Sequence, residues 1–142
     1  MAMAAGDAFR KLHDADLRFG EIEDHEGRRL ELSHATFSQL LISPERSVRR
    51  KAFEQYYKQF EAHENTLAAT LAGSVHRDVY YAKARNYPSS LSAALFPDNV
   101  PEDVYTNLIK SVRDSLPAVH AYLDVRKRKM QIDSIHHYDT YV

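Results

Sequence analysis

The sequence predicts a mainly α-helical protein, with long antiparallel helices and one small β-hairpin near the N-terminus. Over residues 44–87 apolar side chains recur at steps of three or four, which is the period of a helix. Prolines stand where helices are expected to begin, in Ser43-Pro44-Glu45 and Pro101-Glu102-Asp103. Only residues 17–32 read as two short strands around a polar turn that contains a glycine.

The hairpin is expected over residues 17–33, with strands at 17–23 and 28–32. Between them, Asp24-His25-Glu26-Gly27 supplies a polar turn in which Gly27 can adopt a positive φ at little cost. Ser33 is then predicted to cap a short helix. The apolar face of that helix consists of Phe37, Leu40 and Leu41.

The central segment, residues 34–87, is expected to be helical and to contain one very long helix. Its start is Ser43-Pro44-Glu45, and the next proline is Pro88. The apolar period continues for roughly 40 residues, about 60 Å at 1.5 Å per residue. Arg50 and Glu54 are spaced to form an ion pair on its exposed side. The residues that carry the period are Val48, Ala52, Tyr56, Phe60, His63, Leu67, Leu71, Val75, Val79 and Ala82.

The C-terminal part is predicted as a loop, a helix and a tail. Residues 88–100 form the loop, which could contain one helical turn, and residues 101–130 form a helix that Pro117 kinks or breaks. Residues 131–142 read as an extended tail. With these elements, residues 1–142 are expected to form a single partial helical domain.

Composition and charge argue against several classes of protein. Nineteen Lys and Arg against twenty Asp and Glu give a net charge of -1, which argues against nucleic-acid binding. The absence of cysteine excludes disulfide scaffolds, cysteine zinc sites and thiol nucleophiles. Charge-free stretches are shorter than the about 20 residues that a bilayer span needs, and Asp7 interrupts any signal-peptide core. We therefore expect no nucleic-acid partner, no membrane partner and a cytoplasmic location.

Two places begin the zinc-peptidase motif H-E-x-x-H, in which two histidines lie one helical turn apart and the glutamate is the general base. In His25-Glu26-Gly27-Arg28-Arg29 an arginine replaces the second histidine. In His63-Glu64-Asn65-Thr66-Leu67 a leucine replaces it. We interpret His63 as a core or interface residue and His25 as a solvated turn residue.

Two further clusters are also better explained by structural roles. His136 and His137 are adjacent, and adjacent residues of a strand point to opposite faces, so they cannot easily bind one ion. Glu31 and His34 have the Glu-x-x-His spacing of di-iron proteins. They lie on either side of the expected cap at Ser33, however, and no second copy of the motif exists. No metal site is predicted.

The remaining candidates are basic and aromatic. Arg49-Arg50-Lys51 and Arg126-Lys127-Arg128-Lys129 could contact phosphates, but solvated helix faces explain them better, the second at a helix C-terminus. The sequence contains no nucleophile elbow and no glycine-rich phosphate loop. The nine tyrosines, including Tyr56-Tyr57 and Tyr80-Tyr81, read as half-buried packing residues, some of which could line a groove. The residues alone therefore predict no catalytic residue, no metal ligand and no defined substrate-binding residue.

Several distinctive stretches occur in an order that resembles one family. They are Ser43-Pro44-Glu45-Arg46-Ser47-Val48-Arg49, Ala82-Lys83-Ala84-Arg85-Asn86-Tyr87, Val104-Tyr105 with Leu108-Ile109, and the closing Tyr138-Asp139-Thr140-Tyr141-Val142. From about Leu17 onward the chain closely resembles the segment of oligoendopeptidase F-type zinc metallopeptidases that lies just upstream of their catalytic half.

This resemblance implies a larger, mostly helical, bowl-shaped peptidase that encloses short peptides in a central channel. In that family zinc is held by H-E-x-x-H and a downstream glutamate, and none of these residues can be placed on this chain. The chain itself is then expected to bind no cofactor, to supply scaffold and channel wall, and to be inactive alone. Its partners would be the missing catalytic half of the same polypeptide and, in the parent enzyme, short peptides.

Two hypotheses follow from the resemblance and the pattern. The chain is a fragment of such a zinc metalloendopeptidase or, alternatively, a stand-alone helical binding or protein-interaction module without catalysis. The finish at Val142, directly after a strand-like segment, favours the first hypothesis. A long apolar stripe has to be buried against something, so a fragment is expected to expose apolar surface and to self-associate.

Overall fold

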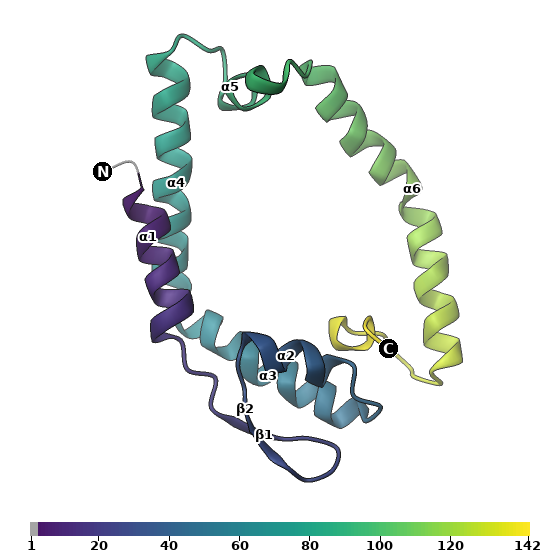
Figure 1. Cartoon of the computed structure of the whole chain (residues 1–142). Coiled ribbons are helices and arrows are strands. Elements are labelled where there is room, and N and C mark those ends of the chain that lie inside the picture. Colours follow the sequence, from purple (N-terminus) through teal and green to yellow (C-terminus); the bar gives the residue numbers. More distant parts are fainter. Residues whose placement is uncertain (1–2) are drawn as a thin grey trace. The chain divides into compact units, whose positions relative to one another are not determined.

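The computed structural model describes residues 3–142 and confirms a mainly helical fold with one small sheet (Figure 1). The chain divides into two compact units: the first comprises Met1–Ala72 together with Ile135–Val142, and the second comprises Gly73–Ser134. That the whole chain is one partial domain of a larger protein stays a prediction. The helices are α1 (Ala4–Lys11), α2 (His34–Leu41), α3 (Arg46–Ala62), α4 (Glu64–Ala84), α5 (Ser90–Leu95) and α6 (Glu102–Lys129), and the strands are β1 (Glu21–Glu23) and β2 (Arg29–Glu31).

The hairpin of β1 and β2 forms where the sequence predicts it, with shorter strands that pair antiparallel. Gly27 in its turn has a φ of +78°, as expected. The turn is organised by Asp24, whose Oδ1 accepts hydrogen bonds from the backbone N–H groups of Glu26 (2.8 Å) and Arg28 (2.9 Å). Burial alone would raise the pKa of the Asp24 carboxyl, but the hydrogen bonds from Arg28 and Glu26 outweigh burial and hold that pKa below its ordinary value.

A second glycine fixes how the hairpin meets α3. Gly20 has a φ of +76°, and a Cβ added there would lie 3.3 Å from the side-chain nitrogen of Gln55. That nitrogen, Nε2, donates to the backbone oxygens of Phe19 (2.6 Å) and Glu21 (3.0 Å). One α3 side chain therefore satisfies two carbonyls at the entry to β1, and glycine is needed both for its φ and for the close approach.

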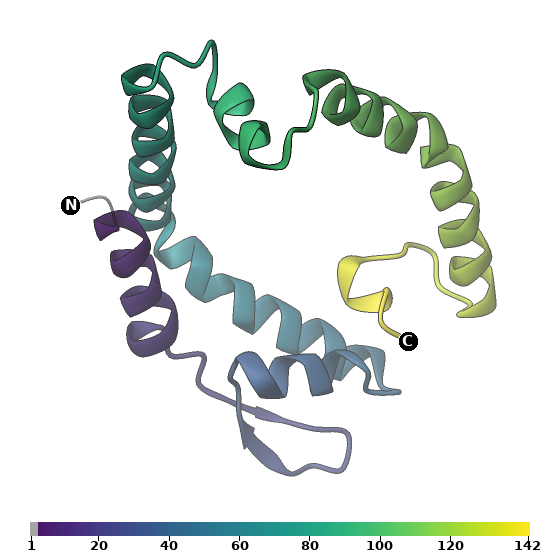
Figure 2. The same ribbon diagram turned by 45° about the horizontal axis from the view of Figure 1, so that its top comes forward.

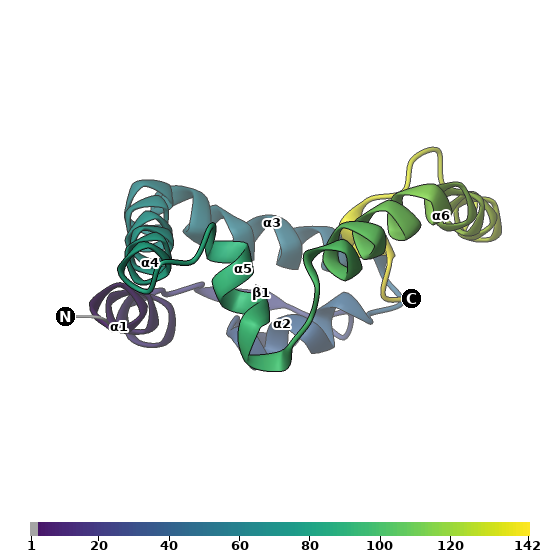
Figure 3. The same cartoon turned by 90° about the horizontal axis from the view of Figure 1, so that it is seen from above.

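The core of the first unit lies between the hairpin, α2 and α3. Ser33 caps α2 as predicted, because its Oγ accepts the N–H of Thr36. Tyr56 of α3 stacks on Phe37 with ring centroids 3.9 Å apart and on Phe19 at 4.5 Å. The helices α2 and α3 pack side by side (Figures 1 and 3). The buried cluster consists of Leu12, Leu17, Phe19, Ile22, Leu32, Leu40, Ala52 and Tyr56.

The prediction of one uninterrupted helix of roughly 40 residues is wrong at His63, where α3 ends and α4 begins. His63 has φ -118° and ψ 18°, outside the helical range. Its Nδ1 donates to the carbonyl of Gln59 at 2.7 Å, while its backbone N–H bonds to Phe60 at 3.1 Å. The His63 side chain thus binds the Gln59 carbonyl, which in a continuous helix would accept the backbone N–H of His63. The apolar period continues in α4 beyond the break, so this pattern could not reveal where α3 ends.

The second unit also differs from the prediction in two places. Residues 88–100, predicted as a loop, contain α5 and a 3₁₀ turn at Phe96–Asp98. Ser89 explains α5, because its Oγ accepts the N–H of Ser92 at 2.9 Å and caps the helix. Of the two outcomes predicted for Pro117, a kink or a break, only the break is wrong, because α6 is continuous and curved (Figure 2). A proline removes one backbone hydrogen bond, and a long helix can accommodate that loss by bending.

None of the helices in residues 3–142 combines the length and the apolar character that crossing a membrane requires.

Candidate functional site

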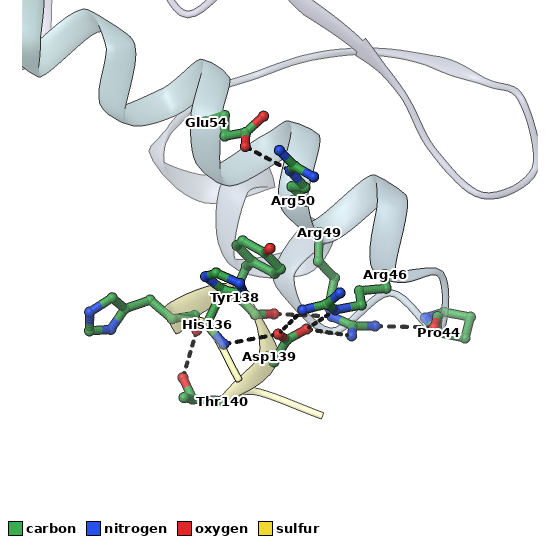
Figure 4. Close-up of polar contacts among 10 residues, drawn as sticks. Pro44, Arg46, Arg49, Arg50, Glu54, His136, Tyr138, Asp139 and Thr140 are labelled. Carbon is green, nitrogen blue, oxygen red and sulfur yellow. Dashed lines mark hydrogen bonds and ion pairs between the residues drawn. The ribbon is translucent and has the colours of Figure 1, made fainter. Parts of the chain in front are cut away.

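A buried polar cluster joins the two chain segments of the first unit. We call Ile135–Val142 the strap, and we call Arg46, Arg49 and Asp139 the clasp. Arg46 and Arg49 lie three residues apart at the start of α3, so both reach the same side of the helix. The strap contains a 3₁₀ turn at His137–Asp139 that carries Asp139 to them (Figure 4). The extended tail predicted over residues 131–142 is therefore wrong at this turn.

The Asp139 side chain is fully buried and is held from both sides of its carboxylate. Arg46 binds it with two donors, Nε to Oδ1 at 3.0 Å and Nη2 to Oδ2 at 2.9 Å. Arg49 Nη2 donates to Oδ1 at 3.0 Å, and the backbone N–H of His136 donates to Oδ2 at 3.0 Å. This last contact closes the 3₁₀ turn, which explains why the strap is not extended here.

Arg49 connects the strap to the segment before α3. Its Nε donates to the carbonyl of Tyr138 at 3.0 Å, and its Nη1 donates to the carbonyls of Ser43 (2.9 Å) and Pro44 (3.1 Å). Arg49 is only 2% exposed. The interpretation of Arg49 as part of a solvated helix face is therefore wrong, because the residue that buries it lies 90 positions away in sequence.

The electrostatics of the clasp favour the charged form of Asp139. Burial alone would raise the pKa of its carboxyl. The hydrogen bonds from Arg46, from the backbone of His136 and from Arg49 outweigh burial and hold the pKa of Asp139 below its ordinary value. Docking of the strap is thus linked to ionisation of one carboxyl group.

Aromatic contacts complete the attachment of the strap. The Tyr138 ring is buried and lies 5.4 Å from the Arg46 guanidinium carbon, a cation–π contact. The His136 ring stacks on Tyr138 at 5.0 Å, and the ring of Phe53 meets Tyr138 edge-on at 5.9 Å. His137 stacks instead on Phe53 at 6.2 Å. The two adjacent histidines thus use different aromatic partners.

An aromatic cleft of about 300 Å³ lies beside the clasp, within the first unit. Its walls come from α2, α3 and the strap, and its polar groups are the phenols of Tyr57 and Tyr141, the imidazole of His137 and the hydroxyl of Thr140. Such a surface suits an apolar side chain with a hydrogen-bonding neighbour. Its lining residues are Phe37, Leu41, Phe53, Tyr57, His137, Thr140 and Tyr141.

The predicted metal-motif residues occupy separate structural positions. His34 is part of the aromatic core: its Nε2 donates to the carbonyl of His13 at 3.1 Å, and its Nδ1 lies 2.6 Å from the Tyr56 hydroxyl. Its ring also stacks on that of His13 at 4.0 Å. His25 lies in the hairpin turn, 3.8 Å from Glu26. Among residues 3–142, no three His, Asp or Glu side chains come together in a way that could hold a metal ion.

The other predicted features have mixed outcomes. Arg50 donates to Glu54 at 2.7 Å on an exposed face, as expected. Of the tyrosines, Tyr56 is buried in the core, and burial, followed by the neighbouring Tyr57, raises the pKa of its hydroxyl. Tyr80 and Tyr81 are exposed rather than half-buried. Sequence reasoning missed the clasp, although its two halves lie in stretches that carry the family resemblance.

The long helix α6 carries an apolar stripe of exposed side chains. No residue of α6 is buried. The stripe extends over about 32 Å at 1.5 Å per residue. Its members at helical spacing are Val104, Leu108, Val112, Val119, Tyr122 and Val125, all exposed.

Comparisons with known proteins identify the family of this chain. The family model described as Peptidase family M3 matches residues 39–142. This match covers most of the chain, which therefore belongs to Peptidase family M3.

The similar proteins confirm the resemblance to oligoendopeptidase F. The chain is 38% identical over 138 residues to "Oligopeptidase PepF" of Bacillus subtilis, which covers 97% of this chain and 21% of the relative. It is 35% identical to "Group B oligopeptidase PepB" of Streptococcus agalactiae, over 97% of this chain and 23% of that protein. The crystal structure of oligoendopeptidase-F from Enterococcus faecium superposes with a TM-score of 0.97 at 39% identity, over 99% of this chain and 28% of that one. The chain thus spans between a fifth and a third of the length of these proteins.

Proposed function

We propose that this chain is part of the helical body of an oligoendopeptidase F-type zinc metalloendopeptidase that hydrolyses short peptides. The observation that carries the proposal is the similarity of nearly the whole chain to a limited segment of "Oligopeptidase PepF", 97% of one and 21% of the other. Peptide hydrolysis belongs, in this proposal, to the complete peptidase, and we infer a cytoplasmic location for it.

The described residues do not fit the zinc of that family. A zinc site needs three or four His, Cys, Asp or Glu ligands around one point. In the described part of the chain both ring nitrogens of His34 already have partners, and Leu67 stands where H-E-x-x-H would need its second histidine. We therefore derive no catalytic step from this chain, and we propose that zinc and its general base belong to another part of the peptidase.

The role we propose for this segment is scaffold and channel wall. Two features support it: the clasp fixes the strap on α3, and α6 presents a long apolar stripe. Apolar stripes of this length are covered in folded proteins. We propose that the missing catalytic half of the same polypeptide covers the stripe, and that the assembled walls enclose a short peptide.

Two measurements on the purified chain and on the complete gene product test this proposal. Elemental analysis and cleavage of a quenched fluorescent peptide should show no tightly bound zinc and no turnover for the 142-residue chain. The complete gene product should contain one zinc per molecule and cleave the peptide. Coding DNA that continues past Val142 in frame into an H-E-x-x-H motif would support the proposal, whereas zinc and turnover in the short chain would contradict it.

A second candidate, a stand-alone helical binding module, is favoured by the same exposed stripe on α6. An independent module would present that surface to another protein. Size-exclusion chromatography with light scattering separates the two. Concentration-dependent self-association of the chain is expected if the stripe belongs to an internal interface of a peptidase, and a compact monomer at high concentration favours the module.

A further inference from the structure

We propose that the strap Ile135–Val142 opens and closes on α3 as a local unit, and that the Asp139 carboxylate is the group that holds it closed. This inference does not depend on the proposed peptidase activity. It rests on three observations: the hydrogen bonds that attach the strap, a hydrophobic core that contains no strap residue, and an aromatic cleft that the strap helps to line.

The attachment of the strap is mainly polar and is concentrated on one carboxylate. Asp139 receives three hydrogen bonds from the two arginines of α3, and Arg49 adds one more to the carbonyl of Tyr138. The apolar contribution comes chiefly from Tyr138, which is buried, whereas Tyr141 and Val142 are exposed.

The core of the first unit is independent of the strap. The buried cluster between the hairpin, α2 and α3 contains no residue of Ile135–Val142. Segments with few buried apolar contacts open without global unfolding. The strap can therefore leave α3 while the cluster around Leu32 and Tyr56 stays packed.

Ionisation of Asp139 decides which state is favoured. When the carboxylate is neutral, Arg46 and Arg49 lose the negative charge that Asp139 supplies, and the guanidinium of Arg49 is buried, which makes this loss costly. The titratable and charged groups that face the clasp are Arg46, Arg49 and Arg50 from α3 and His136, His137 and Tyr138 from the strap.

Opening would also reshape the aromatic cleft. Three of its seven lining residues, His137, Thr140 and Tyr141, belong to the strap. Closure of the strap therefore builds one wall of the cleft, and release exposes Phe53 and Tyr57 of α3.

The chain has no cysteine, so two introduced cysteines can carry spin labels at defined places. We suggest Lys51→Cys on α3 and Tyr141→Cys on the strap, both exposed. Double electron–electron resonance should show one narrow distance in this background and in Glu54→Gln, the matched loss of an exposed carboxylate. Asp139→Asn should raise the open-to-closed ratio at least about tenfold, because charge-assisted hydrogen bonds are roughly twice as strong as neutral ones.

A pH series separates ionisation from a merely structural effect. The pKa of Asp139 is lowered in the closed state, so closure is expected to persist above the ordinary carboxyl pKa and to be lost as pH falls through the lowered value. Asp139→Asn should keep its raised open-to-closed ratio at every pH, because it has no carboxyl group to titrate, and Asp139→Glu should recover part of the pH dependence.

Three results would overturn the proposal. The first is an unchanged narrow distance in Asp139→Asn. The second is equal broadening in Glu54→Gln. The third is broadening of Asp139→Asn that coincides with loss of the helical circular dichroism signal, since the strap would then be inseparable from the core.

Discussion

The two units of this chain are stabilised in different ways. The first unit, Met1–Ala72 with Ile135–Val142, contains every buried hydrophobic residue of the described chain except Ala82. It also contains the clasp and the hairpin. In the second unit, Gly73–Ser134, the 28-residue helix α6 has no buried residue at all.

This difference separates what the chain can stabilise by itself from what it presents to a partner. An amphipathic helix derives most of its stability from packing of its apolar face rather than from its own propensity. The first unit meets that requirement internally, whereas α6 does not. The same contrast underlies the proposal that α6 belongs against another part of a larger peptidase.

The largest effect is expected from breaking the clasp at its buried arginine. Arg49→Ala leaves the carbonyls of Ser43, Pro44 and Tyr138 without that donor and removes one partner of Asp139. We expect the free energy of unfolding to fall by about 3–5 kcal/mol. Urea denaturation followed by circular dichroism measures this.

The matched control for that variant is Arg50→Ala on the same helix. Arg50 forms a solvent-exposed pair with Glu54, so its removal is expected to leave the free energy of unfolding nearly unchanged. Equal losses for the two arginines would show that burial of Arg49 has no energetic consequence.

A pair of leucine variants tests the contrast between the units directly. Leu32 is 1% exposed in the core of the first unit, and Leu32→Ala should lower the free energy of unfolding by about 2–5 kcal/mol. Leu108 is 61% exposed on α6, and Leu108→Ala should lower that free energy by about 0.5 kcal/mol or less. Similar losses at both positions would mean that α6 is packed in solution.

A glycine pair gives a smaller effect. Gly20→Ala forces a left-handed conformation and a 3.3 Å contact with Gln55, so we expect a loss of about 1–2 kcal/mol in the free energy of unfolding. Gly6→Ala lies in α1 with open space around it and should be neutral or stabilising. Thermal melts of both variants provide the measurement, and a neutral Gly20→Ala would contradict the close approach of α3.

Apart from the control variants, the smallest effect is expected for Tyr56→Phe, which keeps the stacked ring and removes the hydroxyl next to His34. The loss should be about 1 kcal/mol, the net value of one hydrogen bond. A loss as large as that for Leu32→Ala would indicate that the hydroxyl, rather than the ring, holds this part of the core.

Much of the fold could be predicted from local pattern. Apolar spacing located α2, α3, α4 and α6, and Gly27 and Ser33 marked a turn and a cap that the structure confirms. The break at His63 could not be predicted, because it depends on a side chain taking a backbone carbonyl while the apolar period continues on both sides. The sequence also could not predict whether the apolar face of α6 is buried, because the same spacing of apolar residues occurs in covered and in exposed helices.

The clasp could not be predicted because its partners are distant in sequence. Arg49 and Asp139 are 90 residues apart, and a basic run at a helix start usually lies in solvent. One signal was present: Ser43–Arg49 and Tyr138–Val142 both carry the family resemblance, and the structure brings these two stretches into contact. The resemblance at these two stretches was therefore a signal of the clasp that the sequence prediction did not use.

Hydrogen exchange of the intact chain, followed by mass spectrometry, tests the central contrast most directly. Amides of α2, α3 and the hairpin are expected to exchange at least about tenfold more slowly than those of α6, because protection follows packing in local units. Exchange in α6 as slow as in the core of the first unit would contradict the account, since α6 would then need no partner beyond this chain.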